Sequence, residues 1–298
     1  MVLKVDYIII LVTDIWDRNL FINLNLERFM SSKFFLFIYI METIRKGSKS
    51  LDVLSLQCSL GCSLLDGVFG EQTEELVKKY QESHNLTADG IVGGGTWGAI
   101  LSERKLGISE ETWEKIAKDL GVEVAVLKAI HSVETSGARY LASGDPALLF
   151  EAHVFYRELK KKGKNPDSLM KSHPRILSKS WNRKLYKGGQ GEVPRINEAW
   201  GISPGIALMS ASFGAFQICG FNYELCGCKN VYEFYKEMWL SEEGQLTLLA
   251  GFLKGSGIIP YMKTKNFSEI ARRYNGEGYK QNKYDTKLKN AYIKYTHV

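Results

Sequence analysis

A short internal repeat constrains this chain more than any other feature of its sequence. DGVFGEQT at residues 66–73 recurs as DGIVGGGT at residues 89–96. In each copy, Asp-Gly suits a turn that needs a positive φ, and Gly-x-x-Thr suits a helix start at which the threonine hydroxyl caps a free backbone N–H. The repeat therefore predicts two similar turn-to-helix corners within one small unit.

The residues around the repeat have helical periodicity. Between the two copies, apolar or aromatic side chains recur at Leu76, Val77 and Tyr80, and an earlier apolar helix is expected at residues 51–60. Each corner also opens a helix. Residues 43–101 are therefore predicted to form a small module of three helices.

The segments KGSKSLDVLSLQ, DGVFGEQTEELVKKYQ and DGIVGGGTWGAIL follow one another through this module. In this order they resemble the peptidoglycan-binding type 1 domain found on many cell-wall hydrolases. The resemblance implies that the module binds peptidoglycan, with Phe69, Tyr80 and Trp97 as candidate contacts. The alternative is that these aromatic residues belong to the core of a small bundle, and it is favoured for Phe69 and Tyr80 more than for Trp97.

A second unit is predicted from residue 109 to residue 298. Its first helix has the serine N-cap Ser109 and ends at Gly121, and the next stretch, VEVAVLKAIHSVE, is an apolar helix whose last residue is Glu134. A carboxyl at such a helix end is partly desolvated, which raises its pKa. A carboxyl that keeps its proton near neutral pH can protonate the leaving oxygen in glycoside cleavage. Without further residues, Glu134 could equally be a surface residue at a helix end.

Two later segments complete a constellation with Glu134. They are SFGAFQI, which begins at Ser212 and contains Gln217, and ARRYNGEGY, which contains Tyr274 and Asn275. In order and kind they resemble the glutamate, Gly-x-x-Gln-Ile and aromatic-Tyr-Asn-Gly elements of goose-type lysozymes and lytic transglycosylases. The resemblance implies one substrate cleft that includes Ser212. In it, Gln217 and Asn275 would bind the glycan or position the glutamate, and Tyr274 would line the cleft near the scissile sugar.

VETSG followed by ASGDPALLFEAHVFYR resembles the N-acetylmuramidase family of modular phage endolysins. The resemblance implies that Glu134 is the catalytic glutamate, and it places Glu151 and His153 in the Leu-Phe-Glu-x-His segment. Glu151 and Asp145 are candidates for a second catalytic carboxylate. At roughly 6.5–9.5 Å from Glu134 either could activate water, and at about 5–5.5 Å either could act as nucleophile. For Glu151 the alternative is a structural pair with His153 or Arg157.

We therefore expect an all-α protein, in which the three-helix module precedes a lysozyme-like helical domain of the goose-type and transglycosylase kind. The resemblance implies hydrolysis of the β-1,4 bond between N-acetylmuramic acid and N-acetylglucosamine, with Glu134 as general acid and without a cofactor. Two alternatives remain open. One is a lytic transglycosylase that leaves 1,6-anhydro ends, and the other is a wall-binding protein without catalytic activity.

The net charge of +6 is concentrated between residues 157 and 187, where eleven lysines and arginines face only Glu158 and Asp167. Such a segment is most often a solvated and partly mobile surface. The alternative is that it holds the protein on anionic wall or outer-membrane surfaces. A nucleic-acid partner is not expected because base-stacking and phosphate-loop motifs are missing.

The five cysteines do not have the spacing of a disulfide framework or of a structural zinc site, so no metal is expected.

Residues 1–40 contain two apolar runs, and each is too short for the ~20 residues that span a bilayer. A small-x-small cleavage site does not follow the second run. The segment METIRKGSKSLDVLSLQ opens the first module, whereas the residues before it match nothing in that module. We therefore expect residues 1–40 to be an extension from a mis-assigned start, with Met41 as the natural first residue.

The expected protein is a monomer without stable membrane insertion. It would be made in the cytoplasm of a bacterial host and act on the cell wall after release through a separate membrane pore.

Overall fold

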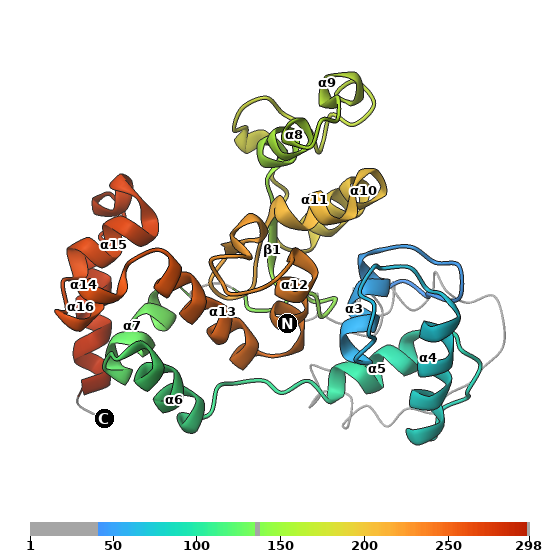
Figure 1. Cartoon of the computed structure of the whole chain (residues 1–298), viewed down its shortest axis with the longest axis horizontal. Helices are drawn as coiled ribbons and strands as arrows, with labels where there is room; N and C mark the ends of the chain where they lie inside the picture. Colours follow the sequence, from blue (N-terminus) through green and yellow to red (C-terminus); the bar gives the residue numbers. More distant parts are fainter. Residues whose placement is uncertain (1–40, 135–137, 297–298) are drawn as a thin grey trace, which may run out of the picture. The chain divides into compact units, whose positions relative to one another are not determined.

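The computed structural model describes residues 41–134 and 138–296, which all belong to one compact unit (Figure 1). The expectations for residues 1–40 lie outside these described residues, as do residues 135–137 of the VETSG motif that follow Glu134. The described chain is helical apart from one small sheet, so the prediction of an all-α fold with short strands is confirmed. Within these ranges, none of the helices combines the length and the apolar character that crossing a bilayer requires.

The N-terminal module has the three predicted helices, α3 (Leu51–Ser59), α4 (Glu71–Ser83) and α5 (Gly94–Ser102). The predicted threonine caps are wrong, because α4 and α5 begin two residues before the threonines and have glycine N-caps. The threonine hydroxyls, at Thr73 and Thr96, instead accept hydrogen bonds from buried glutamines.

Each copy of the repeat is organised by a glutamine of the preceding helix. The Gln57 amide Nε2 donates to Asp66 Oδ1 at 2.9 Å and to Thr73 Oγ1 at 3.5 Å, and Oε1 accepts the N–H of Gly67 at 2.8 Å. Gln81 makes the equivalent set of bonds in the second copy. Its partners are Asp89, Thr96 and Gly90. The structural repeat therefore extends back to a glutamine that lies outside the repeated octapeptide.

The remaining helices pack around the hydrophobic core that they share with the N-terminal module. Ser109 caps the first of them by accepting the N–H of Thr112 at 3.2 Å, and Gly121 ends it in the left-handed conformation, both as predicted. The helices are α6 (Glu110–Leu120), α7 (Val124–Glu134), α8 (Ala152–Lys161), α9 (Pro166–Leu169), α10 (Val193–Ile202), α11 (Pro204–Met209), α12 (Val231–Leu240), α13 (Glu242–Gly255), α14 (Ile259–Lys263), α15 (Phe267–Asn275) and α16 (Tyr284–Thr296).

One antiparallel sheet lies among these helices, with strand order β1 (Leu148–Phe150), β2 (Ala211–Phe213) and β3 (Ile218–Cys219). Leu149 pairs with Ser212, and Ser212 pairs with Cys219. Because side chains alternate along a strand, these three residues form one row on the same face. They are half-buried, whereas their neighbours along each strand are buried in the core.

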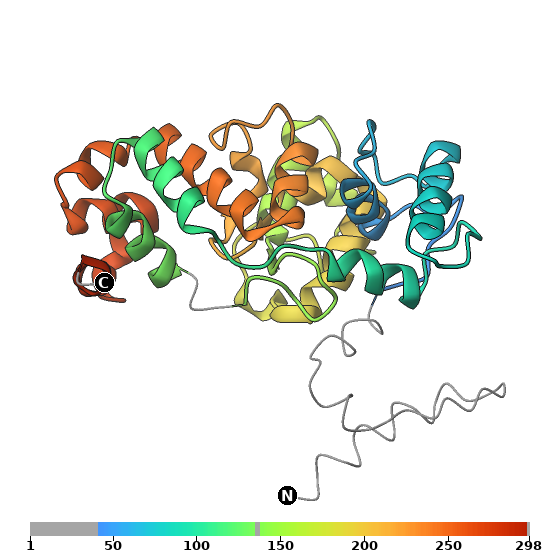
Figure 2. The same cartoon turned by 90° about the horizontal axis from the view of Figure 1, so that it is seen from below.

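The C-terminal helices pack beside α6 and α7, which come first among these helices. In both views, the red C-terminal helices lie beside the green α6 and α7 (Figure 1, Figure 2), and α16 packs along α7. The last helix of the chain is therefore a neighbour of Glu134, the last residue of α7.

The N-terminal module contacts α12 through a mixed polar and aromatic interface. The hydroxyls of Ser55 and Tyr235 are 2.9 Å apart, and Trp239 Nε1 donates to Ser59 Oγ at 2.8 Å. The Trp239 ring also meets the Trp97 ring edge-on, with centroids 6.5 Å apart.

Candidate active site

Glu134 is half-buried at the C-terminal end of α7. Burial raises the pKa of its carboxyl to about 7, against smaller opposing effects of the Asn275 amide and the Lys287 ammonium. The Asn275 Nδ2 is buried and forms no full hydrogen bond, but it lies near enough to the carboxyl to lower its pKa. A carboxyl in this state holds its proton near neutral pH, in agreement with the expectation from the sequence.

The turn between β2 and β3 is held between α7 and α15. The Tyr274 hydroxyl, on α15, donates to the Phe216 carbonyl at 3.4 Å. From α7, the His131 ring meets the Phe216 ring edge-on with centroids 5.4 Å apart. Three of the elements that the sequence analysis singled out therefore meet at one place.

Gln217 ends this turn in an unusual conformation. Its φ of +47° is in the left-handed region, which is costly for a residue with a side chain. Its amide Nε2 donates to the Gly214 carbonyl at 2.9 Å and to the Ala147 carbonyl at 3.2 Å, and these bonds hold the conformation. Strained and exposed residues of this kind are concentrated at functional sites.

Tyr274 contributes a neutral hydroxyl to this end of the fold. Its ring meets Phe252 edge-on at 5.9 Å. Burial, and then the nearby Glu134 charge, raise the pKa of Tyr274 well above its usual value, so the hydroxyl remains protonated. It can therefore donate a hydrogen bond throughout the pH range in which Glu134 titrates.

Two residues of α16 beside Glu134 were not predicted from the sequence. Burial, and then the Glu134 charge, raise the pKa of Tyr284, and the Lys287 ammonium opposes the burial that raises the pKa of Glu134. Their spacing of three residues shows that they share a helix face. It does not show which partner that face meets, so no signal in the sequence assigns them to the site.

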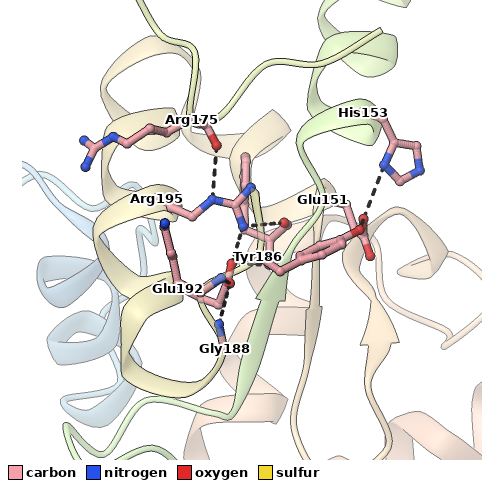
Figure 3. A network of polar contacts seen from close by, with 9 residues as sticks. Glu151, His153, Arg175, Tyr186, Gly188, Glu192 and Arg195 are labelled. Carbon is pink, nitrogen blue, oxygen red and sulfur yellow. Dashed lines mark hydrogen bonds and ion pairs between the residues drawn. The ribbon is translucent and has the colours of Figure 1, made fainter. Parts of the chain in front are cut away.

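Glu151 follows the end of β1 and has polar partners of its own. The Ala147 carbonyl, just before β1, accepts the Gln217 amide, and Glu151 lies four residues later, or about 13 Å along an extended chain at ~3.3 Å per residue. The Glu151 carboxylate accepts the Tyr186 hydroxyl and lies 3.3 Å from His153 Nδ1 (Figure 3). These contacts fit the alternative of a structural pair with His153, and a role of Glu151 as second catalytic carboxylate stays a prediction.

A buried ion pair fixes the end of β1 from which Glu151 projects (Figure 3). Glu192 and Arg195, both almost inaccessible, contact each other directly. Arg195 Nη1 donates to the Phe150 carbonyl at 2.9 Å, and a Glu192 oxygen accepts the Phe150 N–H at 3.2 Å. This pair was not predicted from the sequence, and it holds the strand end and the following helix in place.

Asp145, the other candidate for a second carboxylate, points into the interior. It is 1% exposed and accepts the Ser143 hydroxyl at 2.6 Å, and burial raises its pKa. Among the described residues, no second carboxylate shifts the pKa of Glu134. Ser212 lies in the middle of the half-buried sheet row, between the Gln217 end and the Glu151 end.

Trp97 has no ring face open to a ligand. It is fully buried, and its Nε1 donates to the Glu42 carbonyl at 3.2 Å. The ring packs against Trp239. Phe69 is also buried. A core role therefore fits Trp97 and Phe69, and the expected glycan contact at Trp97 needs correction for this reason.

Among the described residues, no group of three or more His, Cys, Asp or Glu side chains is arranged to hold a metal ion. The chemistry that this site offers consists of a protonated carboxyl, a tyrosine hydroxyl, two amides and a nearby ammonium.

Known proteins resemble both parts of this chain. The N-acetylmuramidase family model matches residues 123–296, and a putative peptidoglycan binding domain matches residues 59–100. A similar solved structure is the crystal structure of Burkholderia AP3 phage endolysin, which is 32% identical over 86% of this chain and 100% of that chain, with a TM-score of 0.61. The muramidase match covers more than half of the sequence. The chain therefore belongs to the N-acetylmuramidase family and is a peptidoglycan hydrolase with an N-terminal peptidoglycan-binding domain.

Proposed function

We propose that Glu134 is the general acid with which this muramidase cleaves the β-1,4 bond between N-acetylmuramic acid and N-acetylglucosamine. The observation that carries the proposal is the half-buried position of Glu134 at the end of α7, where its pKa is about 7. General acids work best when their pKa lies near the working pH. Gln217, Tyr274 and Asn275 surround the same end of the fold and offer hydrogen bonds for the glycan.

The proposed reaction follows from these groups. Glu134 gives its proton to the glycosidic oxygen as the bond from that oxygen to the anomeric carbon breaks. The leaving sugar departs as an alcohol, and positive charge develops on the other sugar. A water molecule then attacks the anomeric carbon and releases a proton, which restores the carboxyl. The nearby Asn275 amide can donate a hydrogen bond to the ionised Glu134 carboxylate between these two proton transfers.

A lytic transglycosylase outcome is the second candidate. It is favoured by the observation that, in the described chain, burial and two non-acidic neighbours account for the pKa of Glu134. A single carboxyl with a pKa near 7 is suited to act first as acid and then as base. The muramyl 6-hydroxyl would then replace water and leave a 1,6-anhydro end.

We further propose that residues 43–101 hold the wall while residues 109–298 cleave it. The protein would act as a monomer without a cofactor, a nucleic-acid partner or stable membrane insertion. It would be made in the cytoplasm of a bacterial host and reach the wall after release through a separate pore. The contacts of α3 with α12 support a joint action of the two parts.

The test is mass spectrometry of the soluble products of purified peptidoglycan. Glu134→Gln is expected to lower kcat by about 10²- to 10⁴-fold, whereas Glu114→Gln on the exposed face of α6 serves as the control. Glu151→Gln is expected to lose far less activity than Glu134→Gln. Reducing muropeptides would support hydrolysis, and 1,6-anhydro products would assign the second candidate. Full activity of Glu134→Gln would contradict the role of Glu134.

A further inference from the structure

A cationic groove of about 390 Å³ runs along α8, away from the Gln217 turn. It is lined by His153, Tyr156, Arg157, Lys160, Lys161 and Lys179. Carboxylates neutralise it only in part, because Glu158 pairs with both Arg157 and Lys161, and Asp167 pairs with Lys179. Lys160 is exposed, and apart from a weak charge effect on Asp167 it forms no ion pair among the described residues. The groove therefore keeps positive charge that is available to an anionic ligand.

Exposed aromatic rings flank this groove. The Phe221 ring is 40% exposed and lies 5.4 Å from the Arg157 guanidinium. Trp181 is 61% exposed and packs on Tyr186, whose hydroxyl bonds to Glu151, the partner of His153 in the groove wall. Exposed aromatic rings supply large, rigid apolar faces against which a ligand ring can pack. The groove thus combines cations with flat apolar surfaces.

The half-buried face of the sheet connects the groove with the Glu134 end of the fold. Ser212 pairs with Cys219, so their side chains lie on one face of the sheet, and Gln217 stands two residues before Cys219 in the turn. Burial raises the pKa of the Cys219 thiol, and the Ser212 hydroxyl, the Glu151 carboxylate and the Arg157 guanidinium also affect it, so these groups lie close to the thiol. The chain from Ala147, whose carbonyl accepts the Gln217 amide, to Glu151 beside the groove spans about 13 Å at ~3.3 Å per residue.

We propose that the α8 groove is a distal subsite for the peptide-bearing glycan strand, in which its cations bind carboxylates of the stem peptides. The proposal rests on the cleavage proposed at Glu134. A glycan strand that crosses the sheet face would place sugars a few units from the cleaved bond beside the groove. Sugar rings match the exposed aromatic faces, and stem-peptide carboxylates match Lys160 and its neighbours. An anionic lipid surface would engage the cations but would not explain the continuity with Gln217.

The experiment compares two charge-matched triple variants. The groove variant is Lys160→Gln with Lys161→Gln and Lys179→Gln. The control carries Lys105→Gln, Lys115→Gln and Lys118→Gln, which are exposed lysines at and near α6. Each is assayed on peptide-bearing peptidoglycan and on the same glycan after enzymatic removal of the stem peptides. Thermal unfolding verifies that both variants are folded, and Lys160→Gln alone provides a variant that breaks no ion pair.

The groove variant is expected to lose about tenfold in kcat/KM on the peptide-bearing substrate, mainly through KM. On the peptide-free glycan its loss is expected to be under about twofold, and the control is expected to match wild type on both. An equal loss on both substrates, or no loss on either, would overturn the subsite. Vesicles of anionic phospholipid that bind wild type but not the groove variant, with unchanged cleavage, would assign the groove to a membrane instead. Failure of wild type to release any glycan product would refute the proposed function itself.

Discussion

At the scale of single residues, Gln57 and Gln81 show how one side chain fixes a turn. The Gln81 side chain is fully buried. It forms hydrogen bonds with the side chains of Asp89 and Thr96, with the Gly90 N–H and with the Ile91 carbonyl. Truncation would leave several of these groups buried without a partner. We expect Gln81→Ala to lower the free energy of unfolding by about 2–4 kcal/mol, measured by denaturant titration. The exposed Gln72→Ala is the control, and an equal effect of both would contradict the buried network.

Glu134, unlike Gln81, destabilises the folded protein, and the size of this destabilisation depends on pH. Its pKa is about 7 in the folded protein and 4.5 without the fold, so the unfolded state loses this proton first. Between these values the unfolded state binds fewer protons, and stability therefore falls as pH rises. Glu134→Gln is expected to be more stable than wild type by about 1–3 kcal/mol at pH 8, with little difference at pH 4. Equal stability at both pH values would contradict the raised pKa.

At the scale of elements, the β2–β3 turn depends on Gly214. Its φ is +73°, and an added Cβ would lie 2.7 Å from Gln245 Oε1 and 2.9 Å from Met238 Sδ. Gly227 has a similar φ of +85° but open space around it, which makes Gly227→Ala a control for backbone strain alone. We expect Gly214→Ala to cost about 2–4 kcal/mol of stability and to lower kcat through Gln217, against about 1 kcal/mol for the control. Wild-type kcat in Gly214→Ala would argue against a role of the turn in positioning.

The order of the helices along the chain was predictable from sequence, whereas the elements that each helix packs against were not. Periodicity and caps located α6 and α7, and motif resemblance singled out Gln217, Tyr274 and Asn275, which the fold brings to one end. The contribution of α16 was not predictable, because spacing identifies a helix face and not the element it meets. The position of Glu151 depends on strand register, which a three-residue strand does not reveal. Gln57 and Gln81 lie nine and eight residues before the repeated Asp-Gly pairs. They are therefore outside the segment whose sequence similarity revealed the repeat.

At the scale of the whole molecule, the described residues form one compact unit even though two family models match separate segments. Trp239 joins the two segments. Its indole donates to Ser59, its ring meets Trp97 edge-on, and the Arg104 guanidinium lies 4.1 Å above it. A chain with such a shared core is expected to unfold in a single cooperative transition.

The decisive variant for this coupling is Trp239→Ala. Loss of a buried tryptophan costs about 3–5 kcal/mol, and here the cost falls on contacts that link the two segments. We therefore expect calorimetry to show one transition for wild type and two for Trp239→Ala, with the peptidoglycan-binding segment melting first. The exposed Trp181→Ala is the control, and it should leave a single transition. Two transitions in wild type would mean that the interface does not couple the segments. A single transition for Trp239→Ala at lower temperature would assign the coupling to Ser55, Tyr235 and the other contacts of α3 with α12.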